Sequence, residues 1–290
     1  AKAVMDTLFS EIKEYYNWCD SKSDPRTNEW FLVPSAYSPL SACLLYMLFV
    51  KLGPLIMKKR EPLELRIPMA LYNFGATALN FYCFSELLIG SWKAGYRYVC
   101  NRVIVSREPQ HMRVANAIWW FYISKYYEML DTVFFILRKK DNQITFLHVY
   151  HHMSILALWW IGIKWVPGGT AFYSSMINAF VHVVMYTYYG LSIFPSLRSY
   201  LWWKRYLTQL QLIQFVSYVV QAVLALNDDC GFPRWVSYGM MIYMVTMISL
   251  FANFYFSTYR KSRSKPEGKQ DKQGEKPNAG VPNGTQKKTN

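Results

Sequence analysis

Long runs of uncharged residues limit the possible folds of this chain more than any other feature of its sequence. Residues 235–259 contain no charged residue and no histidine, residues 206–227 contain no charged residue, and residues 166–197 contain one ionisable group of interest, His182. A helix needs roughly 20 predominantly apolar residues to cross a membrane. The runs therefore predict several membrane-spanning helices and exclude a water-soluble globular domain.

The charged residues lie between these runs and near the C-terminal end. The formal net charge is +14, but only 17% of the 290 residues are charged. The last 31 residues hold 9 Lys or Arg and 3 Asp or Glu. Because the basic residues separate apolar runs instead of forming one binding surface, this pattern excludes a nucleic-acid-binding protein.

The hydropathy pattern predicts an all-α, polytopic membrane protein with seven transmembrane helices. It divides the chain into an N-terminal segment over residues 1–36, a transmembrane domain over 37–259 and a disordered basic tail over 260–290. The predicted spans are residues 37–57, 68–92, 114–137, 144–165, 170–193, 206–227 and 235–259.

Basic residues in alternate loops predict the orientation of these spans. The loops at residues 58–66, 138–140 and 198–205 are basic, as is the tail, whereas residues 1–36 hold 4 basic and 6 acidic residues. The pattern predicts a lumenal N-terminus and a cytosolic C-terminus. The loop over 93–113 is basic as well and disagrees with this assignment.

Two cysteines fall in loops that this topology places in the lumen, Cys100 and Cys230. Because that compartment is oxidising, we predict a disulfide between them, with two free loop thiols as the alternative. The five cysteines include no pair with C-x-x-C spacing, which argues against a metal site built from thiols.

The chain ends in Lys287-Lys288-Thr289-Asn290, with lysines at the fourth and third positions from the end. This pattern matches the dilysine retrieval signal of endoplasmic reticulum membrane proteins, which requires a cytosolic C-terminus. It predicts residence in that membrane, although two such lysines also arise by chance in a lysine-rich tail.

Polar side chains inside the predicted spans are the main functional candidates, because each ionisable group costs about 2.5–3.5 kcal/mol to insert into a bilayer. The candidates are Lys125, Glu128 and Asp131 in the third span, His148, His151 and His152 in the fourth, Asn178, His182, Tyr186 and Tyr189 in the fifth, and Gln211 and Gln214 in the sixth. From the 1.5 Å rise per residue, we place members from all four of these spans roughly 8–14 Å below the cytosolic face, which predicts one shared internal site. The residues placed in this way are Glu128, Asp131, His151, His152, His182, Gln211 and Gln214.

Several kinds of site remain open on these residues. Lys125 can pair structurally with the two carboxylates, and the glutamines can join helices. Histidines 148, 151, 152 and 182 can form a mononuclear metal site, whereas five histidines are too few for a membrane di-iron oxygenase. In metal-free acyl transfer, an imidazole acts as base or nucleophile and needs an orienting partner such as Glu128 or Asp131. A non-enzymatic lipid carrier or channel is a further alternative.

Basic residues at the cytosolic ends of the spans suit a phosphorylated carrier such as coenzyme A, because cationic side chains bind phosphate strongly. An apolar cavity below them would accept a fatty chain. The basic residues concerned are Arg138, Lys139, Lys204 and Arg205.

Four ordered motifs resemble those of the very-long-chain fatty acid elongases, the 3-oxoacyl-CoA synthases of the endoplasmic reticulum. The resemblance covers residues 30–260, and residues 137–140 and 201–207 are most similar to the animal subgroup that handles very long and polyunsaturated chains. The motifs are Lys125-x-x-Glu128-x-x-Asp131-Thr132, His148-Val149-Tyr150-His151-His152, Asn178-x-x-x-His182-x-x-Met185-Tyr186-x-Tyr188-Tyr189 and Thr208-x-x-Gln211.

The resemblance implies that residues 37–259 condense a long-chain acyl-CoA with malonyl-CoA to give 3-oxoacyl-CoA, CO2 and free CoA. It implies six helices around an acyl tunnel open to the cytosol, with coenzyme A thioesters as substrates and no metal or other cofactor. Membrane lipids, the other elongation-cycle enzymes and a second copy of the chain are the expected partners.

The resemblance also assigns roles to the polar residues. His151 is the expected nucleophile, and His148, His152 and His182 position substrate or move protons, together with the charged residues of the third span. The other polar candidates and the four basic residues are the expected substrate contacts.

Overall fold

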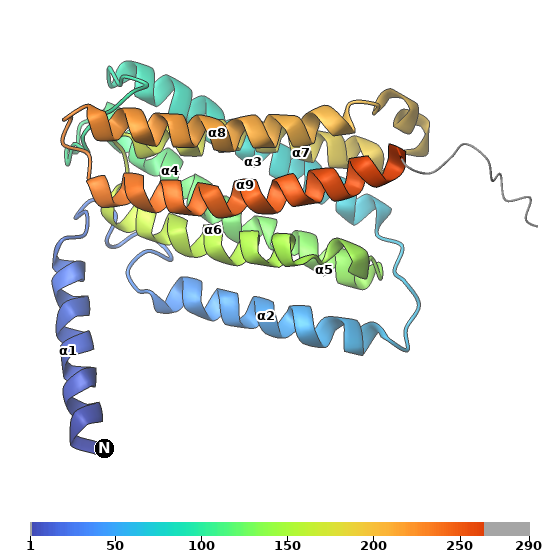
Figure 1. Cartoon of the computed structure of the whole chain (residues 1–290), viewed down its shortest axis with the longest axis horizontal. Helices are drawn as coiled ribbons and strands as arrows, with labels where there is room; N and C mark the ends of the chain where they lie inside the picture. Colours follow the sequence, from blue (N-terminus) through green and yellow to red (C-terminus); the bar gives the residue numbers. More distant parts are fainter. Residues whose placement is uncertain (1, 264–290) are drawn as a thin grey trace, which may run out of the picture. The chain divides into compact units, whose positions relative to one another are not determined.

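The apolar runs of this chain form helices throughout the computed structural model, which describes residues 2–263 (Figure 1). The prediction of an all-α protein is confirmed for that part of the chain. Its elements are α1 (Lys2–Ser21), α2 (Tyr37–Met57), α3 (Arg66–Lys93), α4 (Pro109–Glu128), α5 (Leu130–Leu137), η1 (Asp141–Gln143), α6 (Phe146–Trp165), α7 (Ala171–Ser192), η2 (Pro195–Tyr200), α8 (Lys204–Asn227) and α9 (Arg234–Arg263), where η marks a 3₁₀ helix.

Within residues 2–263, four helices are long and apolar enough to cross a membrane, namely α2, α6, α8 and the Arg234–Ser257 part of α9. They correspond to four of the seven predicted spans. The other three predicted spans fall on α3, on α4 with α5, and on α7. These helices carry buried polar side chains such as Asn80, Lys125 and His182, which lower their hydropathy. Seven spans therefore stay a prediction.

The prediction of one continuous helix over 114–137 is wrong, because α4 and α5 meet at a break at Met129. The amide of Met129 bonds to the carbonyl of Tyr126 at 3.2 Å, and the amide of Thr132 bonds to the carbonyl of Met129 at 3.3 Å. These i→i−3 bonds tighten the turn relative to an α-helix. No Gly or Pro stands at the break, and the residues around it continue the predicted span, so hydropathy alone does not reveal it. The break separates Glu128 on α4 from Asp131 on α5.

The two ends of the chain also differ from the predicted boundaries. Residues 1–36, predicted only as a polar segment, contain α1, and α9 continues to Arg263, inside the predicted tail. The chain divides into two compact units, Ala1–Asn253 and Phe254–Asn290. The rest of the predicted tail, with the retrieval lysines Lys287 and Lys288, lies outside the described residues.

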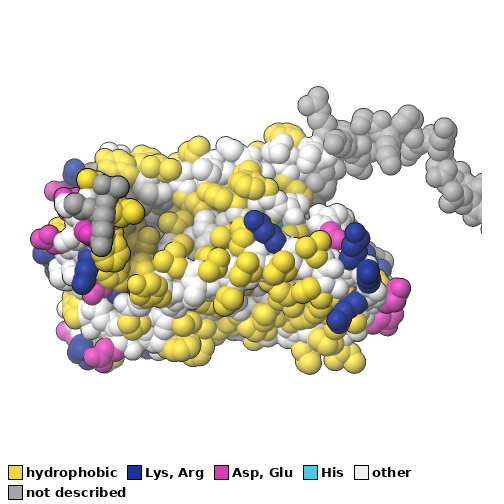
Figure 2. All heavy atoms as spheres, turned by 90° about the horizontal axis from the view of Figure 1, so that it is seen from below, with side chains coloured by type: hydrophobic (Ala, Val, Ile, Leu, Met, Phe, Trp, Pro, Cys, Tyr) yellow, Lys and Arg dark blue, Asp and Glu magenta, His cyan; other side chains and the backbone are white. Residues whose placement is uncertain are grey.

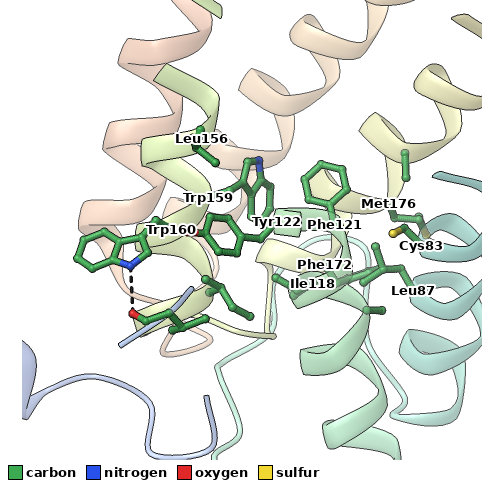
Figure 3. Packing of buried hydrophobic residues seen from close by; sticks show 14 of the residues in the cluster. Cys83, Leu87, Ile118, Phe121, Tyr122, Leu156, Trp159, Trp160, Phe172 and Met176 are labelled. Carbon is green, nitrogen blue, oxygen red and sulfur yellow. Dashed lines mark hydrogen bonds between the residues drawn. The ribbon is translucent and has the colours of Figure 1, made fainter. Parts of the chain in front are cut away.

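The main hydrophobic core lies among α3, α4, α6 and α7, on the N-terminal side of Lys125 along α4 (Figure 3). The ring of Phe121 packs edge-on against Trp159, with the ring centroids 4.8 Å apart. The indole N–H of Trp160 donates to the carbonyl of Val33 at 3.0 Å, which ties the segment before α2 to α6. Because lipid is as apolar as this core, close packing and such hydrogen bonds hold the helices together.

The surface of this bundle is largely apolar between its two ends. On the face shown in Figure 2, Lys, Arg, Asp and Glu side chains gather mostly at the two ends, with hydrophobic side chains between them. The helix α2 exposes a row of leucines, Leu40, Leu44, Leu48, Leu52 and Leu55. Such a continuous row of exposed apolar side chains is unusual on a protein surrounded by water. A surrounding bilayer accounts for both observations.

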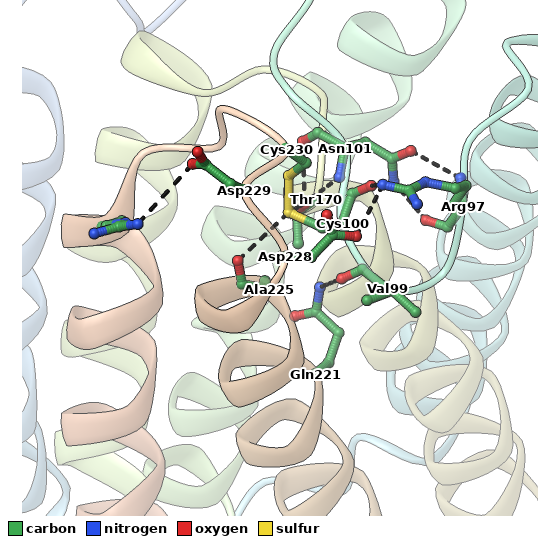
Figure 4. Close-up of a disulfide and its surroundings, with 11 residues drawn as sticks. Arg97, Val99, Cys100, Asn101, Thr170, Gln221, Ala225, Asp228, Asp229 and Cys230 are labelled. Atoms are coloured by element: carbon green, nitrogen blue, oxygen red, sulfur yellow. Dashed lines mark hydrogen bonds and ion pairs between the residues drawn. A yellow bond between two sulfur atoms is a disulfide. The ribbon is translucent and has the colours of Figure 1, made fainter.

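A disulfide joins Cys100 to Cys230, the pair that the sequence predicts, with their Cα atoms 5.9 Å apart (Figure 4). It connects the loop between α3 and α4 to the loop between α8 and α9. Beside it, Arg97 and Asp228 form an ion pair at 2.9 Å between the same two loops. These links fasten one end of the bundle.

Candidate active site

The carboxylate of Glu128 is the centre of a buried polar network built from three helices. The ammonium of Lys125, also on α4, lies 2.9 Å from each carboxylate oxygen. From α7, Nδ1 of His182 lies 3.0 Å from Oε1, and from α3 the amide of Asn80 donates to Oε1 at 3.4 Å. Lys125 also donates to Oδ1 of Asn178 at 3.1 Å. Of the residues that the sequence predicts for one shared site, this network joins Lys125, Glu128, Asn178 and His182.

The Lys125–Glu128 pair is almost inaccessible, since each side chain is 1% exposed. Taking two charges out of water is costly, and their attraction offsets this cost only when the remaining hydrogen bonds are made. The neighbouring groups supply those bonds, and the Lys125 ammonium also lies 4.2 Å from the centroid of the Phe121 ring. The members of this network therefore depend on one another.

Asp131 belongs to a different pair, because it lies beyond the break in the helix. The hydroxyl of Tyr186 donates to its Oδ2 at 2.8 Å. Glu128 contacts a histidine, but that histidine is His182 of α7. The carboxylates therefore have other partners than the 148–152 motif that they were expected to orient.

The histidines of the 148–152 motif have separate surroundings. Nε2 of His148 lies 2.7 Å from Oγ1 of Thr132, and the same oxygen lies 2.7 Å from the hydroxyl of Tyr46. The ring of His152 is buried beside His148, with centroids 4.4 Å apart. A chain of hydroxyl groups from α2 and α5 thus holds this end of α6.

His151 lines a cavity instead, and its ring centroid lies 5.6 Å from that of His152. Its Nδ1 is buried and has no hydrogen-bond partner within the described residues. Asn178 and Gln214 line the same cavity, and Oε1 of Gln214 is likewise buried without a partner in that part of the chain. The cavity wall therefore includes two residues whose buried polar atoms make no hydrogen bond within the described residues.

The cavity has a volume of about 160 Å³ and is lined by α6, α7, α8 and α9. Along α6 its lining runs from His151 to Gly162, which corresponds to roughly 16 Å of helix. Apolar side chains such as Ile155, Phe215 and Met244 form much of the wall. A long apolar chain can lie in such a cavity with its reactive end at the imidazole.

Comparison with known families identifies the chain. Residues 31–267 match the family described as ELO: GNS1/SUR4 family, which is more than half of the sequence. The chain belongs to the ELO family. The match includes the helices that line the cavity and all the polar residues described above.

Characterised relatives in the ELO family are named as elongases. The chain is 49% identical over 267 residues to "Very long chain fatty acid elongase 4" of Homo sapiens, covering 92% of this chain and 85% of that protein. It is 44% identical to "Very long chain fatty acid elongase 2" of Rattus norvegicus, covering 89% of this chain and 92% of that protein. It is 42% identical to "Very long chain fatty acid elongase 5" of Bos taurus, covering 89% and 86%.

The four basic residues predicted as substrate contacts do not line this cavity. Arg138 and Lys139 follow α5, and the ammonium of Lys139 donates to the carbonyl of Lys58 at 3.3 Å. Lys204 and Arg205 begin α8, about ten residues and roughly 15 Å before Gln214. They therefore lie at the helix ends, away from the cavity wall.

Three other predicted contacts, Tyr186, Tyr189 and Gln211, are not among the residues that line the cavity. Tyr186 binds Asp131, and the ring of Tyr189 packs against Tyr186 with centroids 6.1 Å apart. The amide of Gln211 donates to Sδ of Met185 at 3.5 Å. Of the five polar contacts predicted on α7 and α8, Asn178 and Gln214 line the cavity.

The sequence analysis assigns no role to three residues of this site, namely Asn80, Tyr46 and Thr132, although Thr132 stands in one of the quoted motifs. Asn80 is fully buried in α3, and a polar amide inside the predicted span 68–92 is costly, as it is for the residues chosen as candidates. Thr132 and Tyr46 carry hydroxyl groups, which are common in membrane helices, so the contacts of Thr132 with His148 and with Tyr46 have no signal in the sequence.

A metal site is the alternative that the sequence left open for the histidines. Among residues 2–263, no group of three or more His, Cys, Asp and Glu side chains is placed to hold a metal ion. The hydroxyl contact of His148 and the carboxylate contact of His182 direct these two rings to different partners.

Proposed function

We propose that the network around Glu128 and the cavity at His151 form the active site for the condensing step of fatty acid elongation. Its family and its elongase relatives make the chain a very-long-chain fatty acid elongase, a 3-oxoacyl-CoA synthase. The reaction joins a long-chain acyl-CoA to malonyl-CoA and gives 3-oxoacyl-CoA, CO2 and free CoA. The observation that carries the site assignment is the unpartnered Nδ1 of His151 in an elongated apolar cavity.

In the first half of the proposed reaction, His151 attacks the thioester carbon of the acyl-CoA. The carbon–nitrogen bond forms as the carbon–sulfur bond breaks, and the proton lost from the imidazole goes to the departing thiolate. The product is an acyl-imidazole and free CoA. The apolar wall holds the acyl chain, so that its thioester end lies at the imidazole.

In the second half, malonyl-CoA loses CO2, and the resulting enolate attacks the acyl carbon. The carbon–nitrogen bond breaks, 3-oxoacyl-CoA leaves, and the imidazolate of His151 takes one proton from water, which is the proton that the overall reaction consumes. The cationic Lys125 and the amide of Asn178 stand beside the cavity and favour the negative charge of the enolate. Glu128 holds Lys125 and His182 in place for this role.

The substrates and location of this elongase are part of the proposal. Very long chains follow from the names of its relatives, and polyunsaturated chains follow from the motifs shared with the animal subgroup. We assign the protein to the endoplasmic reticulum membrane with a lumenal N-terminus and a cytosolic C-terminus. The other elongation-cycle enzymes and a second copy of the chain are its proposed protein partners.

The nucleophile assignment is tested by intact mass measurement of the purified protein after incubation with an acyl-CoA. We expect the wild type to gain one acyl group and to release it when malonyl-CoA is added. The His151→Ala variant should gain none and should form no 3-oxoacyl-CoA. His111→Gln, at the one histidine outside the site, is the matched control and should behave as the wild type.

Two results would overturn parts of this proposal. An acyl adduct with near-normal turnover in His151→Ala would remove that residue as the nucleophile. A wild-type protein that binds acyl-CoA but yields no malonyl-dependent product would favour a lipid carrier instead.

A further inference from the structure

The first helix, α1, exposes almost all of its large apolar side chains. The exposed fractions range from 40% at Tyr16 to 72% at Val4. Contiguous apolar surface of this kind marks an interaction site, because soluble surfaces rarely expose so much of it. The residues are Val4, Met5, Leu8, Phe9, Ile12, Tyr15, Tyr16 and Trp18.

Most of these side chains share one side of α1. At roughly 100° per residue, those from Val4 to Tyr16 fall within an arc of roughly 140° that contains no charged residue. The charged residues Asp6, Lys13 and Asp20 fall on the rest of the helix surface, and Ser10 lies opposite the middle of the arc. The helix is therefore amphipathic, and its apolar side is left exposed by the part of the chain that the structure describes.

The C-terminal end of α1 is fastened to the last turn of α6. The indole N–H of Trp165 donates to the carbonyl of Cys19 at 2.9 Å, and the ammonium of Lys164 lies 2.7 Å from Oδ1 of Asp20. Because α6 is one of the helices apolar enough to cross a membrane, its last turn marks the level at which the hydrocarbon ends. From this anchor α1 runs across the direction of α2 and α6 (Figure 1).

We propose that α1 is an interfacial helix that lies on the bilayer surface, with its apolar arc in the lipid at the end of the bundle where α6 finishes. A helix across the direction of the spans, fixed at the hydrocarbon boundary, lies in the plane of the membrane. Its aromatic residues near the anchor, Tyr15, Tyr16 and Trp18, are of the types enriched at that depth. The charged side remains in water.

A lipid surface fits these observations better than a second copy of the chain. The helix α1 is joined to a bundle whose own surface is apolar, as the exposed leucines of α2 show. A bilayer therefore already surrounds the position at which α1 begins. The charges distributed over α1 argue against its being a further membrane span. It is also absent from the helices that are apolar enough to cross a membrane.

Photo-crosslinking of the full-length protein in phosphatidylcholine liposomes tests this proposal. The photoreactive amino acid p-benzoylphenylalanine is placed either at Ile12, in the apolar arc, or at Ser10, roughly 160° around the helix. Both positions are exposed, so both variants should fold and retain elongase activity. After irradiation, mass measurement separates lipid adducts from covalent dimers.

We expect the Ile12 position to give a phosphatidylcholine adduct at several times the yield of the Ser10 position. Equal yields at the two positions would show that the helix has no preferred lipid side and would overturn the proposal. A covalent dimer from the Ile12 position would overturn it in favour of a second copy of the chain.

Discussion

The hydroxyl of Thr132 on α5 lies within hydrogen-bond distance of both Nε2 of His148 and the hydroxyl of Tyr46, at 2.7 Å each. Tyr46 belongs to α2, which contributes no residue to the cavity wall. An outer helix thus takes part in orienting a motif histidine. Because a threonine hydroxyl can donate to one neighbour and accept from the other, Thr132 can hydrogen-bond to His148 and Tyr46 at the same time.

Replacing Thr132 by valine should lower the rate of condensation by about tenfold to a hundredfold. The change keeps the shape of the side chain but leaves His148 and Tyr46 without their hydrogen-bond partner. Leaving a buried polar group unsatisfied costs about 1–3 kcal/mol. If this cost is added to the barrier of the reaction, about 1.4 kcal/mol corresponds to a tenfold lower rate. Steady-state rates with saturating substrates are the measurement. Thr132→Ser keeps the hydroxyl and should retain most of the rate. An equal loss of rate in both variants would show that the packing of the threonine side chain, and not its hydrogen bonds, is required.

Removing Lys125 alone should destabilise the protein more than removing it together with its partner. Lys125→Met leaves the carboxylate of Glu128 buried without its cation, which costs about 3–5 kcal/mol. The double variant Lys125→Met, Glu128→Gln has no isolated charge and should recover part of the lost unfolding temperature. Thermal unfolding in detergent measures this difference. An unfolding temperature of Lys125→Met equal to that of the wild type would contradict the prediction.

The sequence predicts the helices of this chain better than their contacts. The predicted span 37–57 coincides with α2, because the length of a predominantly apolar run directly reflects the thickness of the bilayer. The sequence does not predict the break at Met129, which lies inside one predicted span, or the amphipathic α1, which has charges all along its sequence. Run length carries no signal for either feature.

In the candidate site, too, the positions of residues along their helices are predicted better than the contacts between them. The prediction places Glu128 and His182 at one depth, and the structure brings them to 3.0 Å. Which group pairs with which depends on the rotation of each helix about its axis, and hydropathy does not determine that rotation. The sequence therefore assigns a carboxylate to the 148–152 motif, whereas Thr132 holds His148.

Loss of the Cys100–Cys230 disulfide should lower the stability of the folded protein. The bond closes a loop with a sequence separation of 130, so the chain-entropy argument gives roughly 4–5 kcal/mol, and measured values are commonly 2–5 kcal/mol. Thermal unfolding of Cys230→Ser tests this. Cys43→Ser, at a half-buried free thiol, is the matched control and should unfold within a few degrees of the wild type. Equal unfolding temperatures for both variants would argue against a stabilising bond.

Replacing Lys287 and Lys288 by serine should move the protein from the endoplasmic reticulum to later secretory compartments. These lysines stand at the positions that the dilysine signal requires, and a signal read by a receptor depends on position as well as charge. Fluorescence microscopy of the full-length protein is the measurement. Replacing Lys269 and Lys272 removes the same charge and should leave the location unchanged. Unchanged location of the first variant would make the signal dispensable.

Filling the end of the cavity away from His151 should shorten the chains that the enzyme extends. Ala222 of α8 is 2% exposed and lines the cavity, so Ala222→Phe places a ring in the space that we assign to the acyl chain. Val223, the next residue, is 43% exposed and faces away from the cavity, so Val223→Phe is the matched control. Products from acyl-CoAs of graded length are compared by mass spectrometry. We expect Ala222→Phe to lose activity on the longest substrates while keeping it on shorter ones, because a blocked cavity cannot hold the extra methylene groups. An equal loss of activity on all chain lengths would indicate that the substitution disrupts helix packing. An unchanged product profile would show that the acyl chain lies elsewhere.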